Sequence, residues 1–196
     1  MTLRILATAT VICFLTACSQ NTAETTNKAA APADSNHRQP ANYLSDCKQL
    51  FLAARRSDSI LLQQTEIDKA SAGKAIKDFT NFAYYCHADT LSPVFLIKAA
   101  QVAKAINNIP QAKLVLDRCI ADYPSFKNRA AAIFLLAQLY DEPGYLNDEQ
   151  EAKRLYQQII DEYPKSDWAS SAQGAIHFIG KSDNQIMQEL KKKNKK

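Results

Sequence analysis

Glycine is scarce in this sequence, with four among 196 residues, and proline contributes only seven. Phosphate-binding loops and hairpin-rich β folds need backbone at positive φ, which glycine adopts most readily. Both classes are therefore disfavoured. Low glycine and proline content also argues against a collagen-like or low-complexity chain. The length is typical of one domain that buries a substantial core.

Residue patterns that could perform catalysis are also lacking. The three histidines, His37, His87 and His177, stand apart in the sequence, with no Ser/His/Asp order and no metal-binding pair. No Cys-x-x-Cys or Cys/His spacing is typical of zinc binding. We therefore expect a protein that is not an enzyme and that uses no cofactor, no metal and no small-molecule substrate.

The formal net charge of +4 is concentrated near the C-terminus. Five lysines lie there: Lys191, Lys192, Lys193, Lys195 and Lys196. The basic character therefore belongs to a tail and does not predict a nucleic-acid-binding face. We expect residues 191–196 to be a disordered basic tail, with weak contact to anionic lipid headgroups as the alternative.

The first 17 residues have the three parts of a secretory signal: Arg4, an apolar run from Ile5 to Leu15, and small residues after it. The run is shorter than the roughly 20 residues that a membrane-spanning helix needs. Residues 15–18, Leu-Thr-Ala-Cys, resemble the lipobox of bacterial lipoproteins. That resemblance implies a lipoprotein signal peptide over residues 1–17 and a diacylglycerol thioether on Cys18.

The residues after Cys18 predict where the lipid places the protein. Ser19 and Gln20, in place of an aspartate, resemble the outer-membrane sorting pattern of some Gram-negative bacteria. Residues 19–40 hold no apolar side chain larger than alanine, so burial cannot offset their ordering entropy. We therefore expect residues 18–40 to be a lipidated, disordered tether on the periplasmic face of the outer membrane, spanning about 25 Å.

Three cysteines remain in the mature chain: Cys47, Cys86 and Cys119. An odd number in an oxidising compartment leaves at least one free thiol. Cys119 lies on an apolar helical stripe, so we expect it to stay a buried thiol. A disulfide between Cys47 and Cys86 is possible, but we expect these two cysteines not to pair.

Three segments, starting at Lys74, Gln111 and Glu151, align with one another without gaps. Each has an alanine, a large side chain four positions later and an apolar side chain three further on, which is one stripe of an α-helix. The triplets are Ala75, Phe79 and Phe82; Ala112, Leu116 and Cys119; and Ala152, Tyr156 and Ile159. The alanines allow close approach of a neighbouring helix, and Pro124 and Pro164 end the second and third helices.

A second helical pattern precedes each aligned segment, over residues 43–56, 92–106 and 129–140, and another follows from Trp168. Ser92 before Pro93, and Ser166, have the positions of N-caps. Asp148 with Glu151 resembles a capping pair, and Ser182 with Gln185 matches the capping box at the start of a final short helix. Gly180 fits the position after a helix C-terminus.

This helix–turn–helix unit, with alanines 37 and then 40 residues apart, resembles the tetratricopeptide repeat. The small residues of the family's first helix correspond to Ala100, Ala137 and Ala172. The resemblance departs from the family at the loop 141–147, which has extra residues, and in tryptophan content, with Trp168 alone. It covers about residues 44–190. Together with the lipobox, the chain is similar to small tetratricopeptide-repeat lipoproteins of Bacteroidota-type envelopes.

The resemblance implies an all-α fold: a right-handed α–α solenoid of about three helix pairs plus a C-terminal capping helix, over residues 41–190. In such a fold the first helix of each pair lines a concave face that suits an extended peptide or a helix. That expected partner-binding face comprises Ile97, Gln101, Lys104, Phe134, Gln138 and Asp141. It lacks the Lys/Asn/Arg set that clamps chaperone carboxylates in some repeat proteins.

We therefore expect a lipid-anchored periplasmic scaffold or adaptor that binds partner proteins of the cell envelope. Two alternatives come from more distant resemblances. One is an accessory subunit of outer-membrane β-barrel assembly, because the repeat lipoprotein of that machine is similar. The other is an adaptor of cell division, like the periplasmic repeat protein of the Tol–Pal system.

Overall fold

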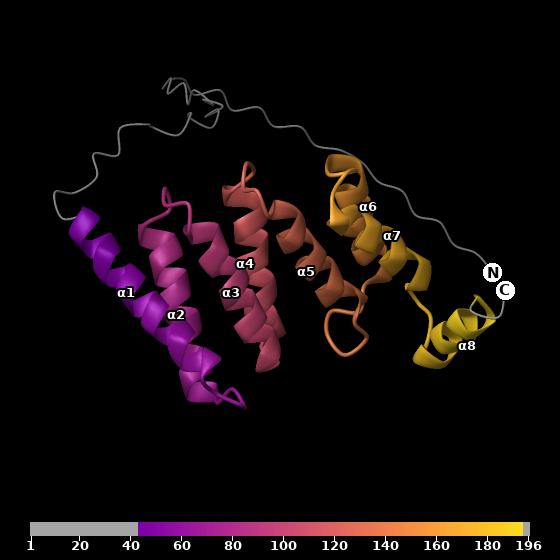
Figure 1. Ribbon diagram of the computed structural model, residues 1–196, viewed down its shortest axis with the longest axis horizontal. Coiled ribbons are helices and arrows are strands. Elements are labelled where there is room, and N and C mark those ends of the chain that lie inside the picture. Colours follow the sequence, from indigo (N-terminus) through magenta and orange to yellow (C-terminus); the bar gives the residue numbers. More distant parts are fainter. Residues whose placement is uncertain (1–42, 194–196) are drawn as a thin grey trace, which may run out of the picture. The chain divides into compact units, whose positions relative to one another are not determined.

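The computed structural model describes residues 43–193, which form eight α-helices and no strand in that range (Figure 1). The helices are α1 (Tyr43–Leu62), α2 (Lys69–Tyr85), α3 (Ser92–Ala105), α4 (Ile109–Asp122), α5 (Arg129–Asp141), α6 (Glu149–Glu162), α7 (Asp167–Phe178) and α8 (Asp183–Lys193). From α1 to α7 each helix packs against the next in sequence. The all-helical fold, arranged as an α–α solenoid, is confirmed.

The alanines of the aligned segments lie inside the helix packing. Ala75, Ala112 and Ala152 are all completely buried. The large residues that follow them on α2, α4 and α6, such as Phe79, are buried too. A side chain of one carbon lets the neighbouring backbones approach, and dense packing of the larger residues then follows. The repeat register predicted from the sequence is therefore confirmed.

Most of the predicted helix ends are also confirmed. The Asp148 carboxylate accepts a hydrogen bond from the Glu151 amide at 3.0 Å, and the Ser166 hydroxyl accepts one from the Ala169 amide at 3.2 Å. Ser182 and Gln185 exchange the two bonds of a capping box. Gly180 has φ of 73°, the left-handed conformation expected after α7.

Ser92 is an exception to this pattern, because it does not cap α3. The residue before the helix is Leu91, and no side chain caps this N-terminus. Ser92 is fully buried, and its hydroxyl donates to the Cys86 carbonyl oxygen at 2.7 Å. The prediction of a Ser92 cap is wrong, because this hydroxyl satisfies a carbonyl group at the end of α2 instead.

The first helix is longer than the apolar pattern predicts: α1 extends to Leu62 and not only to about residue 56. Ser57 and Asp58 interrupt the apolar pattern, yet both are buried. Ser57 donates to the Asp78 carboxylate of α2, and the Lys98 ammonium of α3 lies 2.7 Å from the Asp58 carboxylate. Paired polar groups therefore continue the buried face of α1.

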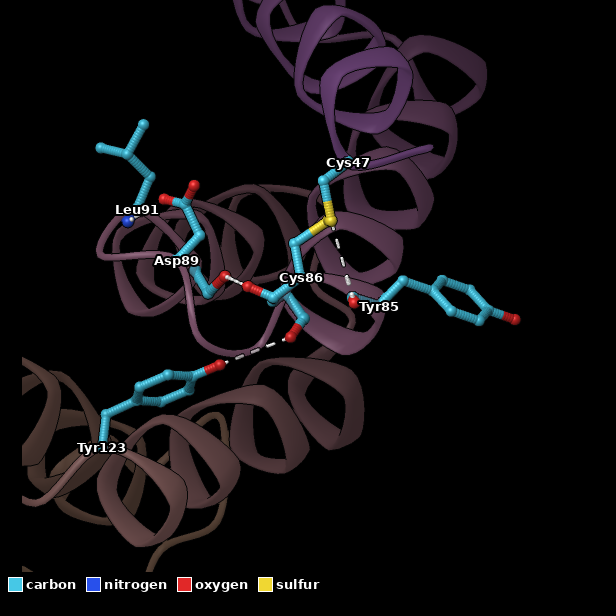
Figure 2. Close-up of a disulfide and its surroundings, with 8 residues drawn as sticks. Cys47, Tyr85, Cys86, Asp89, Leu91 and Tyr123 are labelled. Carbon is cyan, nitrogen blue, oxygen red and sulfur yellow. Dashed lines mark hydrogen bonds between the residues drawn. A yellow bond between two sulfur atoms is a disulfide. The ribbon is translucent and has the colours of Figure 1, made fainter. Parts of the chain in front are cut away.

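Within residues 43–193 the cysteines form a disulfide and leave one free thiol. Cys47 and Cys86 form a disulfide, with Cα atoms 5.7 Å apart (Figure 2), so the expectation that they stay unpaired is wrong. Because α1 and α2 form an antiparallel hairpin, the start of α1 lies against the end of α2. Cys119 is free and buried, as expected, and burial raises the pKa of its thiol to about 12.

The C-terminal helix also differs from expectation. Helix α8 continues through Lys193, so Lys191–Lys193 are helical and do not belong to a disordered tail. Residues 194–196 of that predicted tail, the predicted signal peptide and the predicted tether up to residue 40 lie outside the described residues.

Replacing Ala112 by glutamate tests the close packing of α4. An unpaired carboxylate in this fully buried position should lower the free energy of unfolding by about 3 to 5 kcal/mol. Leu114→Glu on the same helix is the matched control, because Leu114 is 62% exposed and its replacement should cost less than about 0.5 kcal/mol. Urea denaturation measures both. Equal stability of the two variants would mean that the register is wrong.

Removing the disulfide tests how α1 is held. Cys47→Ser with Cys86→Ser should lower the free energy of unfolding by about 2 to 4 kcal/mol, since the bond closes a loop between residues 39 positions apart. A reducing agent should destabilise the wild-type chain by a similar amount and leave the double variant unchanged. A wild-type chain whose stability does not respond to the reductant would contradict the pairing.

Candidate functional site

The expected partner-binding face consists of two stripes with the same spacing on α3 and α5. Successive members are four and then three positions apart, which places each stripe on one side of its helix. Gln101 is exposed and the other five are half-buried, so each stripe is partly accessible. The α3 stripe is Ile97, Gln101 and Lys104, and the α5 stripe is Phe134, Gln138 and Asp141.

Helices α3 and α5 border a narrow crevice, and residues of α4 form its floor. Gln101 and Lys104 form its α3 side, while Leu135 and Leu139 form its α5 side. The crevice has a volume of about 20 Å³, which is room for one water molecule. The crevice is thus too small to hold a small-molecule ligand.

The loop between α5 and α6 also borders this face, through Tyr145. The Lys104 ammonium lies 5.7 Å from the centre of the Tyr145 ring, a cation–π contact. The loop is held against α5, because the Leu146 amide donates to the Leu139 carbonyl and the Asp148 amide donates to the Tyr140 carbonyl. The sequence showed the extra residues of this loop, but Tyr145 was not predicted to lie at the face. An aromatic residue within the insertion was the signal that could have indicated it.

Phe134 is enclosed by aromatic side chains of the two following helices. Its ring centre lies 5.3 Å from that of Tyr156 on α6 and 5.2 Å from that of Trp168 on α7. Phe134 therefore packs α5 against α6 and α7. Trp168 is 37% exposed and is the more accessible ring of this cluster, although sequence reasoning did not place it on the face.

Asp141 ends α5 and is connected to α6. The Tyr156 hydroxyl donates to the Asp141 carboxylate at 3.4 Å. Burial raises the pKa of Asp141, the negative charges of Glu142 and Glu149 raise it further, and the hydrogen bond from Tyr156 opposes both effects. The mixed character of the face therefore comes mainly from Gln101 and Lys104, with Asp141 partly withdrawn into the packing of the hairpin.

A separate, larger hollow of about 580 Å³ lies between the α2–α3 and α4–α5 turns. Pro93, Tyr123 and Phe126 contribute apolar surface to it, and His87 and Lys127 contribute polar atoms. The Tyr123 hydroxyl donates to the Ala83 carbonyl at 3.4 Å (Figure 2), which connects α2 to the residue after α4. The sequence did not predict this hollow, because it forms between turns of different repeats.

Titratable side chains do not converge on a reactive centre in the described part of the chain. Within residues 43–193, no group of three or more His, Cys, Asp or Glu side chains is arranged to hold a metal ion. His177 instead lies 3.1 Å from the Glu189 carboxylate, which also accepts from Lys181. These contacts connect α8 to α7 and to the turn between them.

Cys18, the predicted lipidation site, lies outside the described residues. Among the helices from α1 to α8, none is long and apolar enough to cross a membrane. Contact with a bilayer through Cys18 therefore remains a prediction from the sequence.

Comparison with known proteins gives one family. Residues 131–166 match the family model described as tetratricopeptide repeat, a span that includes nearly all of α5, the loop with Tyr145, α6 and the turn up to the N-cap of α7. No curated protein matches the chain significantly. The α5–α6 hairpin thus has the sequence of a tetratricopeptide repeat, and the match supports a tetratricopeptide-repeat protein built from further hairpins of the same plan.

Proposed function

We propose that this protein is a lipid-anchored adaptor of a bacterial outer membrane that binds a partner protein in the periplasm. The tetratricopeptide repeat at residues 131–166 is the observation that carries the proposal, because this repeat fold typically serves protein–protein interaction without catalysis. The lipobox-like residues 15–18 supply the anchor and the location.

The disulfide supports an exported location. Structural disulfides persist in oxidising compartments such as the periplasm and are rare in the cytosol. The Cys47–Cys86 bond joins the two ends of the α1–α2 hairpin, and Cys119, the remaining thiol of the described helices, is buried. This arrangement suits a protein that folds after secretion, in agreement with the proposed signal peptide over residues 1–17.

The partner would contact the face formed by α3 and α5. Gln101 offers an amide that both donates and accepts hydrogen bonds, and Lys104 offers a cation beside the Tyr145 ring. The crevice between them and α5 is too narrow for a deeply inserted side chain. An extended peptide or a helix that lies along the surface fits these features better than a small molecule does.

Cys18→Ala tests the proposed anchor. The variant cannot form the thioether, and we expect it to leave the membrane fraction or to accumulate with its signal uncleaved. Fractionation of cells and mass spectrometry of the N-terminal peptide measure both outcomes, with Cys119→Ala as the control for loss of a cysteine elsewhere. Unchanged membrane association of the Cys18 variant would refute the lipid anchor.

Photo-crosslinking in intact cells tests the partner-binding face. A photoreactive residue at position 101 should form a discrete crosslinked product with an envelope protein, which mass spectrometry would identify. The same residue at Lys153, exposed on α6, is the matched control and should form little of that product. Equal yields from positions 101 and 153, or none from position 101, would contradict the face.

A further inference from the structure

Two exposed tyrosines lie at one end of the α1–α2 hairpin. Tyr84 and Tyr85 are the last residues of α2, and each is 59% exposed. Their rings contact each other edge to face, with centres 4.9 Å apart. The Arg118 side chain of α4 lies over the Tyr84 ring at 5.1 Å. This pair is not part of the core, so its aromatic surface is available for an interaction.

The disulfide fixes this pair beside the start of α1. Cys86 follows Tyr85 directly and is bonded to Cys47, and the Tyr85 carbonyl oxygen lies 3.9 Å from the Cys47 sulfur. Figure 2 shows the Tyr85 side chain pointing away from the disulfide and from the helices around it. The tyrosines therefore lie at the end of the domain where the chain that leads from Cys18 enters α1.

Carboxylates lie in the connections at the opposite end of the domain. In Figure 1 the α1–α2 and α5–α6 connections lie together at that end, away from the α2–α3 and α4–α5 turns. They carry Glu66, Asp68, Glu142 and Asp148. Hydrogen bonds from the amides and hydroxyl at the start of α2 lower the pKa of Asp68 to about 2, so it remains charged.

We infer that the end bearing Tyr84 and Tyr85 docks on the lipid bilayer, with both rings among the headgroups. This inference rests on the proposed anchor at Cys18. Only 25 positions separate Cys18 from Tyr43, and a flexible chain of that length spans about 25 to 30 Å. Helix α1 has 20 residues, so its other end lies about 30 Å from Tyr43 along the helix axis. The anchor thus favours contact through the tyrosine end.

The chemistry of this end suits the bilayer interface. Tyrosine has an apolar ring and a polar hydroxyl, and it is enriched where hydrocarbon meets water. Lys48, next to Cys47, is exposed and can pair with lipid phosphate. Leu91, at the end of the α2–α3 turn, is 39% exposed. The hollow between Pro93 and Phe126 opens at this end too, which adds apolar surface beside the tyrosines.

Depth-dependent fluorescence quenching tests the docking. The chain has one tryptophan, so Trp168→Phe gives a background in which Tyr85→Trp supplies the only indole. The chain, expressed with its signal and purified from cells, is incorporated into vesicles of phosphatidylethanolamine and phosphatidylglycerol with brominated acyl chains. We expect the position-85 emission to shift to the blue and to be quenched about twofold or more.

Leu62→Trp in the same background is the matched control, because Leu62 is 79% exposed at the other end of α1. Its emission should be unaffected by brominated lipid. Similar quenching at positions 85 and 62 in a vesicle-bound chain would overturn the docking and leave the anchor intact. A chain that is not retained on vesicles and has unmodified Cys18 would overturn both.

A protein partner at the tyrosine end would give a different result. In that case the position-85 indole would be shielded from a water-soluble quencher in native envelope membranes but not in vesicles of lipid alone. This outcome would also overturn lipid docking. Shielding at position 85 in vesicles of pure lipid, without shielding at position 62, would support it.

Discussion

Burial of a small side chain in the second helix of each hairpin is the constraint on which the rest of this structure depends. Ala75, Ala112 and Ala152 are completely buried, one in the second helix of each of the first three hairpins. At these points a larger side chain would hold the helices apart and leave the neighbouring aromatic and aliphatic residues without partners. The accessible stripes on α3 and α5 keep their positions only because the hairpins beneath them pack at this distance.

Much of the fold could be predicted because its determinants are local in sequence. The apolar stripes recur every three or four residues, and Asp148, Ser166 and the Ser182–Gln185 pair each cap a helix within three residues of themselves. A side chain that acts on its own helix leaves its signal in a short window. The same holds for the α5–α6 hairpin, whose local pattern matches the tetratricopeptide repeat.

The features that were missed depend on contacts between distant segments. Ser92 resembles an N-cap in its own window, but its hydroxyl meets a carbonyl group at the end of α2. The proximity of Cys47 and Cys86 can be predicted only when the lengths of α1 and α2 are known. The end of α1 was misplaced because Ser57 and Asp58 interrupt its apolar pattern, although both are buried with partners on α2 and α3. On the candidate face, the sequence shows the spacing of the two stripes, but the enclosure of Phe134 by Tyr156 and Trp168 depends on the packing of α6 and α7.

The disulfide connects the local hairpin to the proposed function in a way that neither cysteine indicates alone. Under the proposed anchor, a load on the N-terminal chain would reach the domain at the start of α1, and the bond would pass that load to the end of α2 within five residues of Tyr43. The residues from Cys47 to Cys86 are thereby closed into a loop that tension on the N-terminal chain cannot open. The face on α3 and α5 lies beyond this loop in the sequence. An adaptor anchored at its N-terminus, as proposed, would keep its first hairpin closed under such a load because of this bond.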